Sequence, residues 1–495
     1  MKRLSLFIML SVAVLLTACN GIDNVGPDVE TVAAKQKTST IIRDVNVSKN
    51  EAIDVANRFV RSNSDGNIIR TKSAFASTKM IRSSETIRED GNNLMYVFNY
   101  QGGGFVIVGS TRNYYPILAY SDEGSFVLQE DMGPVDVWLD ETKVSIKNSN
   151  SLDNDTKAQM QNLWSMYDGT LVDPAQELLS ARRPQTRSTG EDACWDRIDS
   201  LQAEHGDEGW TYLPVSQVEE LFTDLGFSND YATICYCASQ NHSELNETVI
   251  GYRYPAVNQV GPLLTTEWHQ GSPYNSLCPN QYPAGSEVIA TAQIMRYYAH
   301  PDTLMWEGNT ITWADIPVSP NTVPNKIPHL IRRLGQLYKE NYGASGTSTF
   351  IAYVLSGMMS KGYLPIDAEN ETNYRNQIFN NHRPVLMIGT KSNDPLSEHY
   401  AWVCDGVRQA VYNEIQYYTE NQPYGAGQFT QGMYTYYNPG LSGQPVGNPI
   451  YRYHMNWGLP GGTYNGWFTA NYIYCAPIDY NYNRINYYIY VNPNY

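Results

Sequence analysis

The sequence predicts an α+β protein of more than one domain, and three observations carry this prediction. The chain has 495 residues, about three lengths of the roughly 150 residues typical of one domain. Its front half alternates helical spacing with short apolar runs, and its back half has a helix pattern at residues 286–295 followed by strand-like runs. Apolar residues make up 42% and charged residues 17%, which excludes a disordered acidic chain.

The charge of the chain is acidic and unevenly distributed. The formal net charge is −16, and residues 256–495 hold 12 Lys and Arg against 15 Asp and Glu, so −13 belongs to the first 255 residues. An acidic protein repels the phosphates of nucleic acids. We therefore expect no nucleic-acid partner.

The first 19 residues predict a leader peptide rather than a part of the fold. Lys2 and Arg3 precede an apolar run at residues 4–16, which is shorter than the ~20 residues of a membrane-spanning helix. The run leads into Leu-Thr-Ala-Cys, which has the small residues and the cysteine of a bacterial lipoprotein signal. We expect cleavage before Cys19, lipid on Cys19, and localisation in the bacterial cell envelope or outside the cell. The alternative is an ordinary secretory signal that happens to contain a cysteine.

Residues 20–185 predict a smaller α+β front domain that begins with a polar tether. Ser48 and Glu51 have the spacing of a capping box, and apolar residues follow them at helical spacing. Short apolar runs between turn residues then indicate an antiparallel meander at residues 94–98, 105–108, 117–120 and 126–128.

The front domain is expected to end in two helices and an exposed linker. The helical patterns lie at residues 135–146 and 155–167. A basic, proline-containing stretch follows at residues 181–188, which is typical of a linker and of a proteolytic nick site. Residues 186–255 match no pattern and are left as an unplaced linker or insertion.

A break at Pro283-Ala284-Gly285 places Ser286 at the start of the apolar helix pattern. The N-terminus of a helix has free N–H groups and the positive end of the dipole, which stabilise a nucleophile's anion or an oxyanion. Ser286 is therefore a candidate site residue. Taken alone, a serine before an apolar helix is most often an N-cap.

Four segments follow one another in a familiar order along the back half. They are Trp-x-Gln…Pro-Tyr-Asn at residues 268–275, the helix at residues 285–295, the strand-like run from His399 to Gly406, and Asn-Trp-Gly…Gly-Gly at residues 456–462. The order resembles the streptopain family of papain-like cysteine peptidases, which are secreted bacterial zymogens with an inhibitory propeptide. The family's helix reads Gly-Cys-Val-Ala-Thr-Ala-x-Ala-Gln-Ile-Met, and its strand reads His-Ala-x-Val-x-Asp-Gly. Residues 104–110 and 116–121 look like the core of its propeptide.

This resemblance implies a papain-like two-lobed domain at residues 256–495, with a helical lobe and an antiparallel β lobe. It implies that residues 20–185 are an inhibitory propeptide that binds the peptidase domain in cis. It further implies peptide or protein substrates and no cofactor.

The resemblance also assigns roles to five residues. Gln270 would be the side chain of the oxyanion hole, Ser286 would occupy the position of the nucleophile, and His399 would be the general base and acid. Asn456 and Trp457 would be supporting residues that orient or shield His399.

The sequence departs from the family at two places. The family has cysteine where this chain has Ser286, and a papain-type site works because thiolate and imidazolium form an ion pair. A hydroxyl is a far weaker acid than a thiol, so activity is expected to be weak or absent. In the final loop, the Leu459-Pro460 pair stands where the family's Asn-Trp-Gly-Trp-Gly-Gly has its second Trp, so one Trp that would help to wall the site is missing.

Three functions are therefore open: a peptidase, a pseudo-peptidase that binds peptide or a protein partner, and a surface lipoprotein that binds glycan through the Tyr-rich tract at residues 412–437. Cys278 is an alternative nucleophile, although it lies before the helix start and is followed by Pro279. Cys404 is disfavoured because it is five positions from His399, an odd separation that points the two side chains to opposite faces of a strand. Metal-binding motifs such as His-Glu-x-x-His are absent from the sequence.

Overall fold

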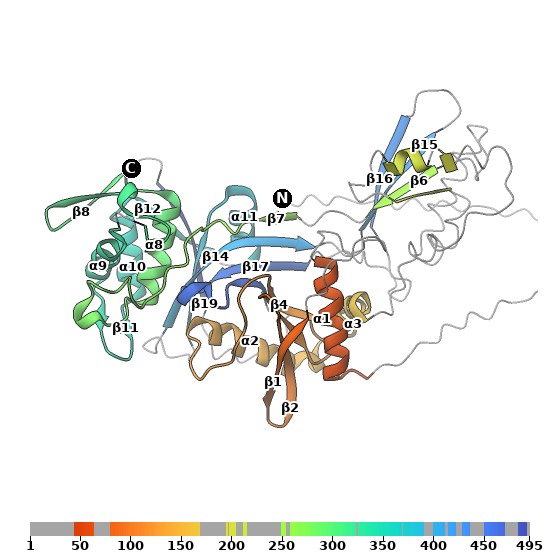
Figure 1. Cartoon of the computed structure of the whole chain (residues 1–495), viewed down its shortest axis with the longest axis horizontal. Helices are drawn as coiled ribbons and strands as arrows, with labels where there is room; N and C mark the ends of the chain where they lie inside the picture. Colours follow the sequence, from red (N-terminus) through yellow and green to blue (C-terminus); the bar gives the residue numbers. More distant parts are fainter. Residues whose placement is uncertain are drawn as a thin grey trace, which may run out of the picture. The chain divides into compact units, whose positions relative to one another are not determined.

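The computed structural model describes the chain in segments (Figure 1). These are residues 44–63, 80–168, 195–203 without 197, 211–214, 249–253, 258–322, 325–368, 370–390, 399–410, 414–421, 428–435, 450–470 and 484–492. The predicted leader with Cys19, the linker at residues 181–188 and most of residues 186–255 lie outside them.

The front domain begins with the predicted capping box. The Ser48 N–H donates to Glu51 Oε2 at 2.8 Å, and the Glu51 N–H donates to Ser48 Oγ at 3.3 Å. These bonds satisfy N–H groups that a helix start leaves free. The helix they begin and the elements after it are α1 (Lys49–Asn63), β1 (Ile81–Glu89), β2 (Asn92–Tyr100), β3 (Phe105–Gly109), β4 (Ile117–Ser121), α2 (Pro134–Asn148) and α3 (Asn154–Asp168).

The meander differs from its prediction at both ends. β1 was not predicted, because its sequence is largely polar, as an edge strand's can be. The run at residues 126–128 is not a strand. Its backbone at Phe126 bonds instead to the side chain of Asn99, which accepts from the Phe126 N–H at 2.6 Å and donates to the Phe126 carbonyl at 2.9 Å.

The back domain combines helices with antiparallel strands, which confirms the predicted fold class. The elements that precede the site strand are β7 (Asn258–Val260), α8 (Ser286–Tyr298), β8 (Thr303–Trp306), β9 (Asn309–Thr312), α9 (Ile327–Leu337), β10 (Asn341–Tyr342), β11 (Thr347–Ser348), α10 (Ile351–Met359), β12 (Tyr363–Asp367), α11 (Glu371–Asn381) and β13 (Val385–Thr390). Those that follow are β14 (His399–Ala410), β17 (Ile450–Asn456), β18 (Gly466–Thr469) and β19 (Arg484–Val491).

One large antiparallel sheet runs through both domains. Its order in the described part of the chain is β1-β2-β3-β4-β18-β17-β14-β13-β19-β12, and β7 also pairs with β14. The junction is the pairing of β18 with β4, in which Trp467 is opposite Tyr120 and Phe468 is opposite Ala119. The meander of the front domain therefore continues directly into the strands of the back domain.

A separate antiparallel sheet has the order β16-β15-β6-β5. Its strands are β5 (Thr211–Pro214), β6 (Val249–Arg253), β15 (Glu414–Asn421) and β16 (Gln428–Thr435). The predicted Tyr-rich tract at residues 412–437 falls on β15 and β16, where the side chains are outside the described part. No helix in the described residues is long and apolar enough to cross a membrane.

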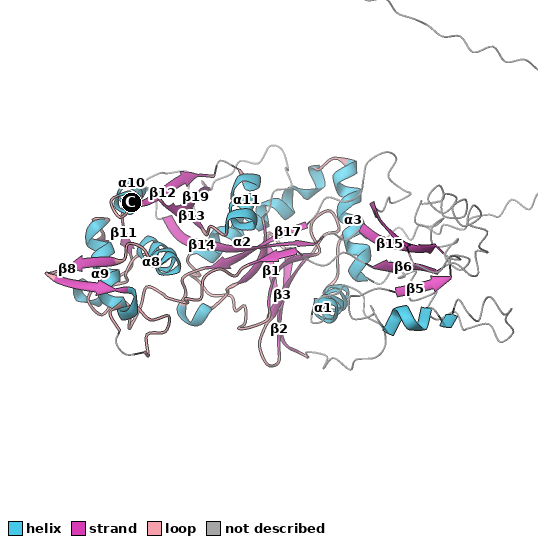
Figure 2. Cartoon of the chain, turned by 90° about the horizontal axis from the view of Figure 1, so that it is seen from above, coloured by secondary structure: helices cyan, strands magenta, loops and turns pink. Residues whose placement is uncertain are grey.

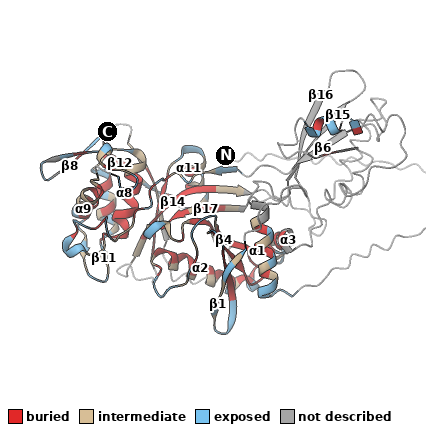
Figure 3. Ribbon diagram, viewed as in Figure 1, coloured by how far each residue is buried: buried red, intermediate tan, exposed pale blue. Residues whose placement is uncertain are grey.

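The strands of the back domain separate two apolar cores. Helices α8, α9 and α10 gather beside β14 (Figures 1 and 2), and the residues they bury there form what we call the helix core. The other core contains residues of both domains, and we call it the shared core. Along β14, Ala401 and Val403 belong to the helix core, and Trp402 and Cys404 to the shared core. Buried positions accordingly run along α8 and β14 (Figure 3).

Candidate active site

The start of α8 requires the glycine that precedes it. Gly285 is the N-cap residue with a φ of 94°, and a Cβ there would lie 3.1 Å from Oε1 of Glu340. Ser286 is the first residue of the helix, as predicted. Because Gly285 holds the N-cap position, Ser286 is not the N-cap.

The hydroxyl of Ser286 has two hydrogen-bond partners. The N–H of Ala401 on β14 donates to Ser286 Oγ at 3.0 Å, and the hydroxyl lies 3.0 Å from Oε2 of Glu287. A carboxylate only accepts, so the hydroxyl proton is directed to Glu287. Ser286 is thus fixed between α8 and β14, with its proton on the side of a carboxylate.

Glu287 contacts both Ser286 and His399. Its Oε1 is 3.0 Å from His399 Nε2, while its Oε2 contacts Ser286. The spacing to His399 is that of an ion pair, although the angle is not that of a hydrogen bond. The Glu287 side chain is only 1% exposed. One buried carboxylate therefore connects the two residues that were predicted to act together.

A second carboxyl group, that of Glu340, adjoins the helix start. Both of its oxygens are buried and have no hydrogen-bond partner among the described residues. Burial, and then the nearby Glu287 carboxylate, raise the pKa of Glu340 to about 9. Glu340 is therefore neutral at pH 7, and this keeps a second negative charge away from Glu287.

Gln270 lies on a loop that is attached to the approach to α8. The Ala284 N–H donates to the Gln270 carbonyl at 2.9 Å, and the nearby Trp268 N–H donates to Oε1 of Gln293 on α8 at 3.0 Å. The loop that was predicted to supply the oxyanion hole is therefore next to the helix start. The role of the Gln270 side chain stays a prediction.

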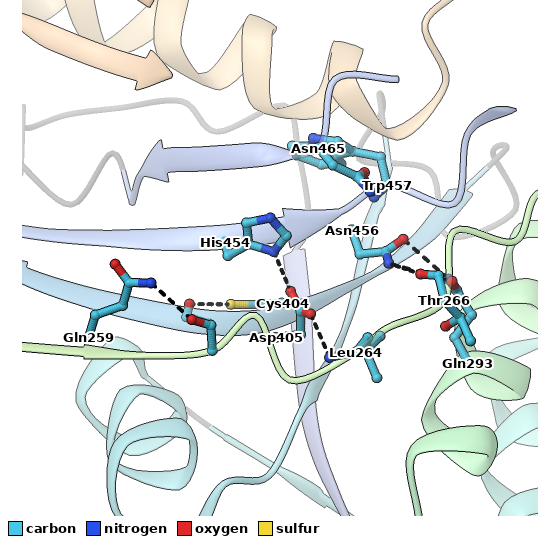
Figure 4. Close-up of polar contacts among 12 residues, drawn as sticks. Gln259, Leu264, Thr266, Gln293, Cys404, Asp405, His454, Asn456, Trp457 and Asn465 are labelled. Atoms are coloured by element: carbon cyan, nitrogen blue, oxygen red, sulfur yellow. Dashed lines mark hydrogen bonds and ion pairs between the residues drawn. The ribbon is translucent and has the colours of Figure 1, made fainter. Parts of the chain in front are cut away.

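Asn456 contacts α8 and the Trp268 loop (Figure 4). Its Nδ2 donates to the Thr266 carbonyl at 2.7 Å, and its Oδ1 accepts from Nε2 of Gln293 at 3.3 Å and from the Gly458 N–H at 3.3 Å. These contacts hold the end of β17 against the helix. They give Asn456 a structural task, whereas its predicted support of His399 stays untested.

Trp457 belongs to the shared core. Its ring centroid is 5.3 Å from that of Trp402, and its Nε1 donates to the Tyr464 carbonyl at 3.0 Å. Tyr400 packs on the same core, two positions from Trp402. His399 contacts Glu287 of α8, so it lies on the opposite face of β14 from Tyr400, Trp402 and Trp457.

His399 does not align with the histidine of the family pattern. The streptopain pattern His-Ala-x-Val-x-Asp-Gly has its last six positions at residues 401–406, so its histidine position falls on Tyr400. His399 lies one residue before that position. Sequence reasoning missed both Tyr400 and Glu287. The count of positions would have found Tyr400, and the family's Val directly after its Cys would have marked Glu287 as unusual.

The alternative cysteines are unsuited to nucleophilic attack. Burial raises the pKa of the Cys278 thiol, which therefore stays protonated at neutral pH. Cys404 is fully buried in the shared core, on the opposite face of β14 from His399 as predicted.

A buried ion pair lies beside this region on β14 and β17 (Figure 4). His454 Nδ1 is 2.6 Å from Asp405 Oδ1, and Oδ2 of Asp405 accepts from the Leu264 N–H at 3.0 Å. Asp405 lies at an irregularity in the β14–β17 register. Within the described segments, no group of three or more His, Cys, Asp or Glu residues could hold a metal ion.

Two family models match the chain. Residues 44–146 match the Spi protease inhibitor family, and residues 268–468 match the peptidase C10 family. No curated protein shows significant similarity to the chain.

Two solved structures from Prevotella intermedia are similar to the chain. A mutant prointerpain A fragment has a TM-score of 0.38 and 14% identity, with 82% of this chain and 97% of that chain covered. Active wild-type interpain A cysteine protease has a TM-score of 0.30 and 17% identity, with 46% of this chain and 94% of that chain covered.

Proposed function

Because residues 268–468 form a peptidase C10 domain behind the Spi inhibitor domain of residues 44–146, we propose that this chain is a streptopain-type peptidase precursor that has lost thiol-type hydrolysis. On this proposal it is a pseudo-peptidase, and its remaining task is to bind peptide or a protein partner. The observation that carries the proposal is the Ser286–Glu287–His399 contact chain, in which one buried carboxylate contacts both the hydroxyl at the nucleophile position and the imidazole.

The Ser286 hydroxyl occupies the position of the family's nucleophile. A serine hydroxyl becomes a nucleophile when an adjacent base takes its proton. Here the hydroxyl proton is directed to the Glu287 side chain. His399 is in contact with the other oxygen of that carboxylate. The same carboxylate thus holds both groups between which the usual proton transfer would run.

The negative charge at the start of α8 also bears on hydrolysis. The N-terminus of a helix favours one negative charge, and in a peptidase that charge is the thiolate or the oxyanion. Glu287 is a buried carboxylate in the first turn of α8 and so occupies this favourable position. An oxyanion formed nearby would be repelled by it. Glu287 therefore opposes the charge development that hydrolysis requires.

The family pattern has its histidine at the position of Tyr400. Tyr400 takes that position, so a phenol replaces the imidazole that would serve there as general base. A side chain on Gly133 of the front domain would lie only 3.7 Å from the Tyr400 ring. The front domain thus adjoins the face on which the family pattern places its base.

Stepwise restoration tests this proposal. We would assay the full chain, cut between its two domains, on casein as the wild type and as Ser286→Cys, Ser286→Cys/Glu287→Val and Ser286→Cys/Glu287→Val/Tyr400→His. We expect no turnover by the wild type or the single variant and measurable turnover by the triple variant. Cys278→Ser in the triple background is the control, and it should leave the gained activity unchanged.

One outcome would overturn the proposal directly. If the wild type cleaves casein and Ser286→Ala abolishes that cleavage, the chain is an active serine-type hydrolase. Binding is tested separately by retention of the full chain on an immobilised peptide library. Retention should persist in Ser286→Ala, because binding does not need the hydroxyl.

Export and lipid anchoring are a further part of the proposal. The support is the sequence of the first 19 residues, with its charged start, short apolar run and Cys19. Expression in a bacterium with labelled fatty acid should label the wild type and not Cys19→Ala. Secretion of an unlabelled wild-type chain would favour the ordinary secretory signal.

A further inference from the structure

The back domain relies on the front domain to cover one face of its sheet. The helix core covers the first face of β13 and β14, and the shared core covers the second. Three aromatic residues on this second face, Trp402, Trp457 and Phe468, are at most 1% exposed. A sheet is stable when both of its faces are packed. Here much of the second packing layer comes from residues of the Spi inhibitor domain.

The aromatic packing crosses directly between the domains. The ring centroid of Phe468 is 4.8 Å from that of Trp138 on α2, and Tyr464 packs on Phe126 at 4.9 Å. On β13, a Cβ at Gly389 would lie 2.7 Å from Cγ1 of Val137 on α2. The absence of a side chain at Gly389 therefore allows α2 to lie directly on the sheet.

Backbone and polar contacts continue this packing. Strands β4 and β18 form one ladder, and Trp138 Nε1 donates to the Thr469 carbonyl at 3.2 Å. Tyr464 donates to the Val127 carbonyl, and Arg408 donates to the Tyr120 hydroxyl. The edge groups of β4 and β18 are therefore satisfied by each other and would be open after separation.

Arg452 is a buried cation at the same junction. It is 3% exposed, its Nη2 donates to the Ile117 carbonyl at 3.4 Å, and its guanidinium lies 5.6 Å from the Phe59 ring and 5.9 Å from the Tyr120 ring. Ile117, Phe59 and Tyr120 belong to the front domain. Arginine and large aromatic residues in a desolvated centre are typical of the strongest positions in protein interfaces.

We propose that the front domain is a permanent structural part of this protein, which stays bound after the chain is cut between the two domains. A propeptide that is released must leave a folded domain behind it. Release here would uncover Phe468, Tyr464 and the edge of β18, and so would open apolar surface of the kind that soluble monomers rarely carry in large patches. The proposal goes beyond the proposed loss of hydrolysis, because it does not depend on whether Ser286 is active.

The test uses the full chain with a recognition sequence for a site-specific protease inserted between residues 181 and 188. After complete cleavage, the sample is diluted to about 10 nM, where a micromolar complex dissociates, and analysed by size-exclusion chromatography. We expect the two fragments to co-elute. They should also co-elute in 1 M salt, because apolar packing is not screened. Separation of the wild-type fragments at about 1 μM under native conditions overturns the proposal.

Three variants of the cut chain locate the binding to this junction. Phe468→Ala should weaken the association by a factor of roughly 100 or more, because it removes a buried ring between the domains. Phe350→Ala, at a residue that is 61% exposed, is the matched control and should not change it. Arg452→Lys keeps the charge and loses the planar guanidinium, so a several-fold weakening is expected. If Phe468→Ala does not fold, Arg452→Lys and the wild type still decide the outcome. Association that is unaffected by both variants would contradict the assigned junction.

Discussion

The two faces of β14 are both packed in apolar cores, but they carry different polar residues at the candidate site. On the helix-core side, Ala401 and Val403 are buried in the helix core, and His399 contacts Glu287. On the shared-core side, Trp402 packs on Trp457, yet Tyr400 stands where the family pattern has histidine. Apolar residues at alternate positions therefore keep a strand packed, whichever polar residues stand beside them. The polar residues that catalysis requires can change without loss of the strand.

The largest test of this comparison removes the main aromatic residue of the shared-core face. Trp402→Ala deletes a fully buried side chain that packs on Trp457, and should lower the free energy of unfolding by about 3–5 kcal/mol. Denaturant unfolding of the full chain measures it. Phe350→Ala, at an exposed aromatic position, should stay within about 0.5 kcal/mol of the wild type. Equal losses in the two variants would mean that the shared core does not carry the stability assigned to it.

The next test concerns the ion pair at the irregularity of β14. Asp405→Ala leaves His454 and the Leu264 N–H without their carboxylate, and should cost about 3 kcal/mol of unfolding free energy. Asp405→Asn, which can still accept from Leu264, should cost less. If Asp405→Ala is as stable as the wild type, the pair contributes nothing net, and the junction of β14 and β17 is held by packing alone.

The pH dependence of stability probes the helix-core side. The raised pKa of Glu340 means that the folded chain holds a proton up to about pH 9, whereas the unfolded chain releases it near pH 4.5. The contribution is therefore fully present below pH 4.5 and is lost as the pH rises toward 9, with a slope of at most about 1.4 kcal/mol per pH unit. Glu340→Gln should flatten the decline in stability between pH 5.5 and pH 8, measured by thermal unfolding.

Glu130→Gln is the matched control for this pH profile, since Glu130 is an exposed carboxylate. It should leave the profile of the wild type unchanged. A decline that persists undiminished in Glu340→Gln would show that another group near the helix start takes up the proton.

The sequence was informative where local rules decide the structure. The capping box at Ser48, the helix start at Ser286 and the strand at residues 399–406 follow from residue spacing, and all three are present. The run at residues 126–128 failed because a single side chain, Asn99, takes up its backbone groups. That bond spans 27 residues, and no local pattern encodes it.

The sequence predicted which segments form the candidate site, but it did not predict which side chains contact one another there. Ser286 and His399 come from segments that are far apart in the chain, and their shared partner Glu287 was recognised only from the contacts. The nucleophile position could be located because the helix pattern is long and specific. The histidine position could be fixed only by counting every position of the family pattern, since a shift of one residue on a strand moves a side chain to the other face.

The smallest expected effect distinguishes a structural Asn456 from a catalytic one. Asn456 and Gln293 exchange contacts between β17 and α8, and Gln293 also accepts from the Trp268 N–H. A double-mutant cycle with Asn456→Ala and Gln293→Ala should give a coupling energy of about 1 kcal/mol in unfolding. Measurable coupling means that the contact between Asn456 and Gln293 stabilises the packing of β17 on α8. Additive losses would mean that the contact between Asn456 and Gln293 does not contribute to stability. The support of His399 that the family resemblance implies would then be the remaining role for Asn456.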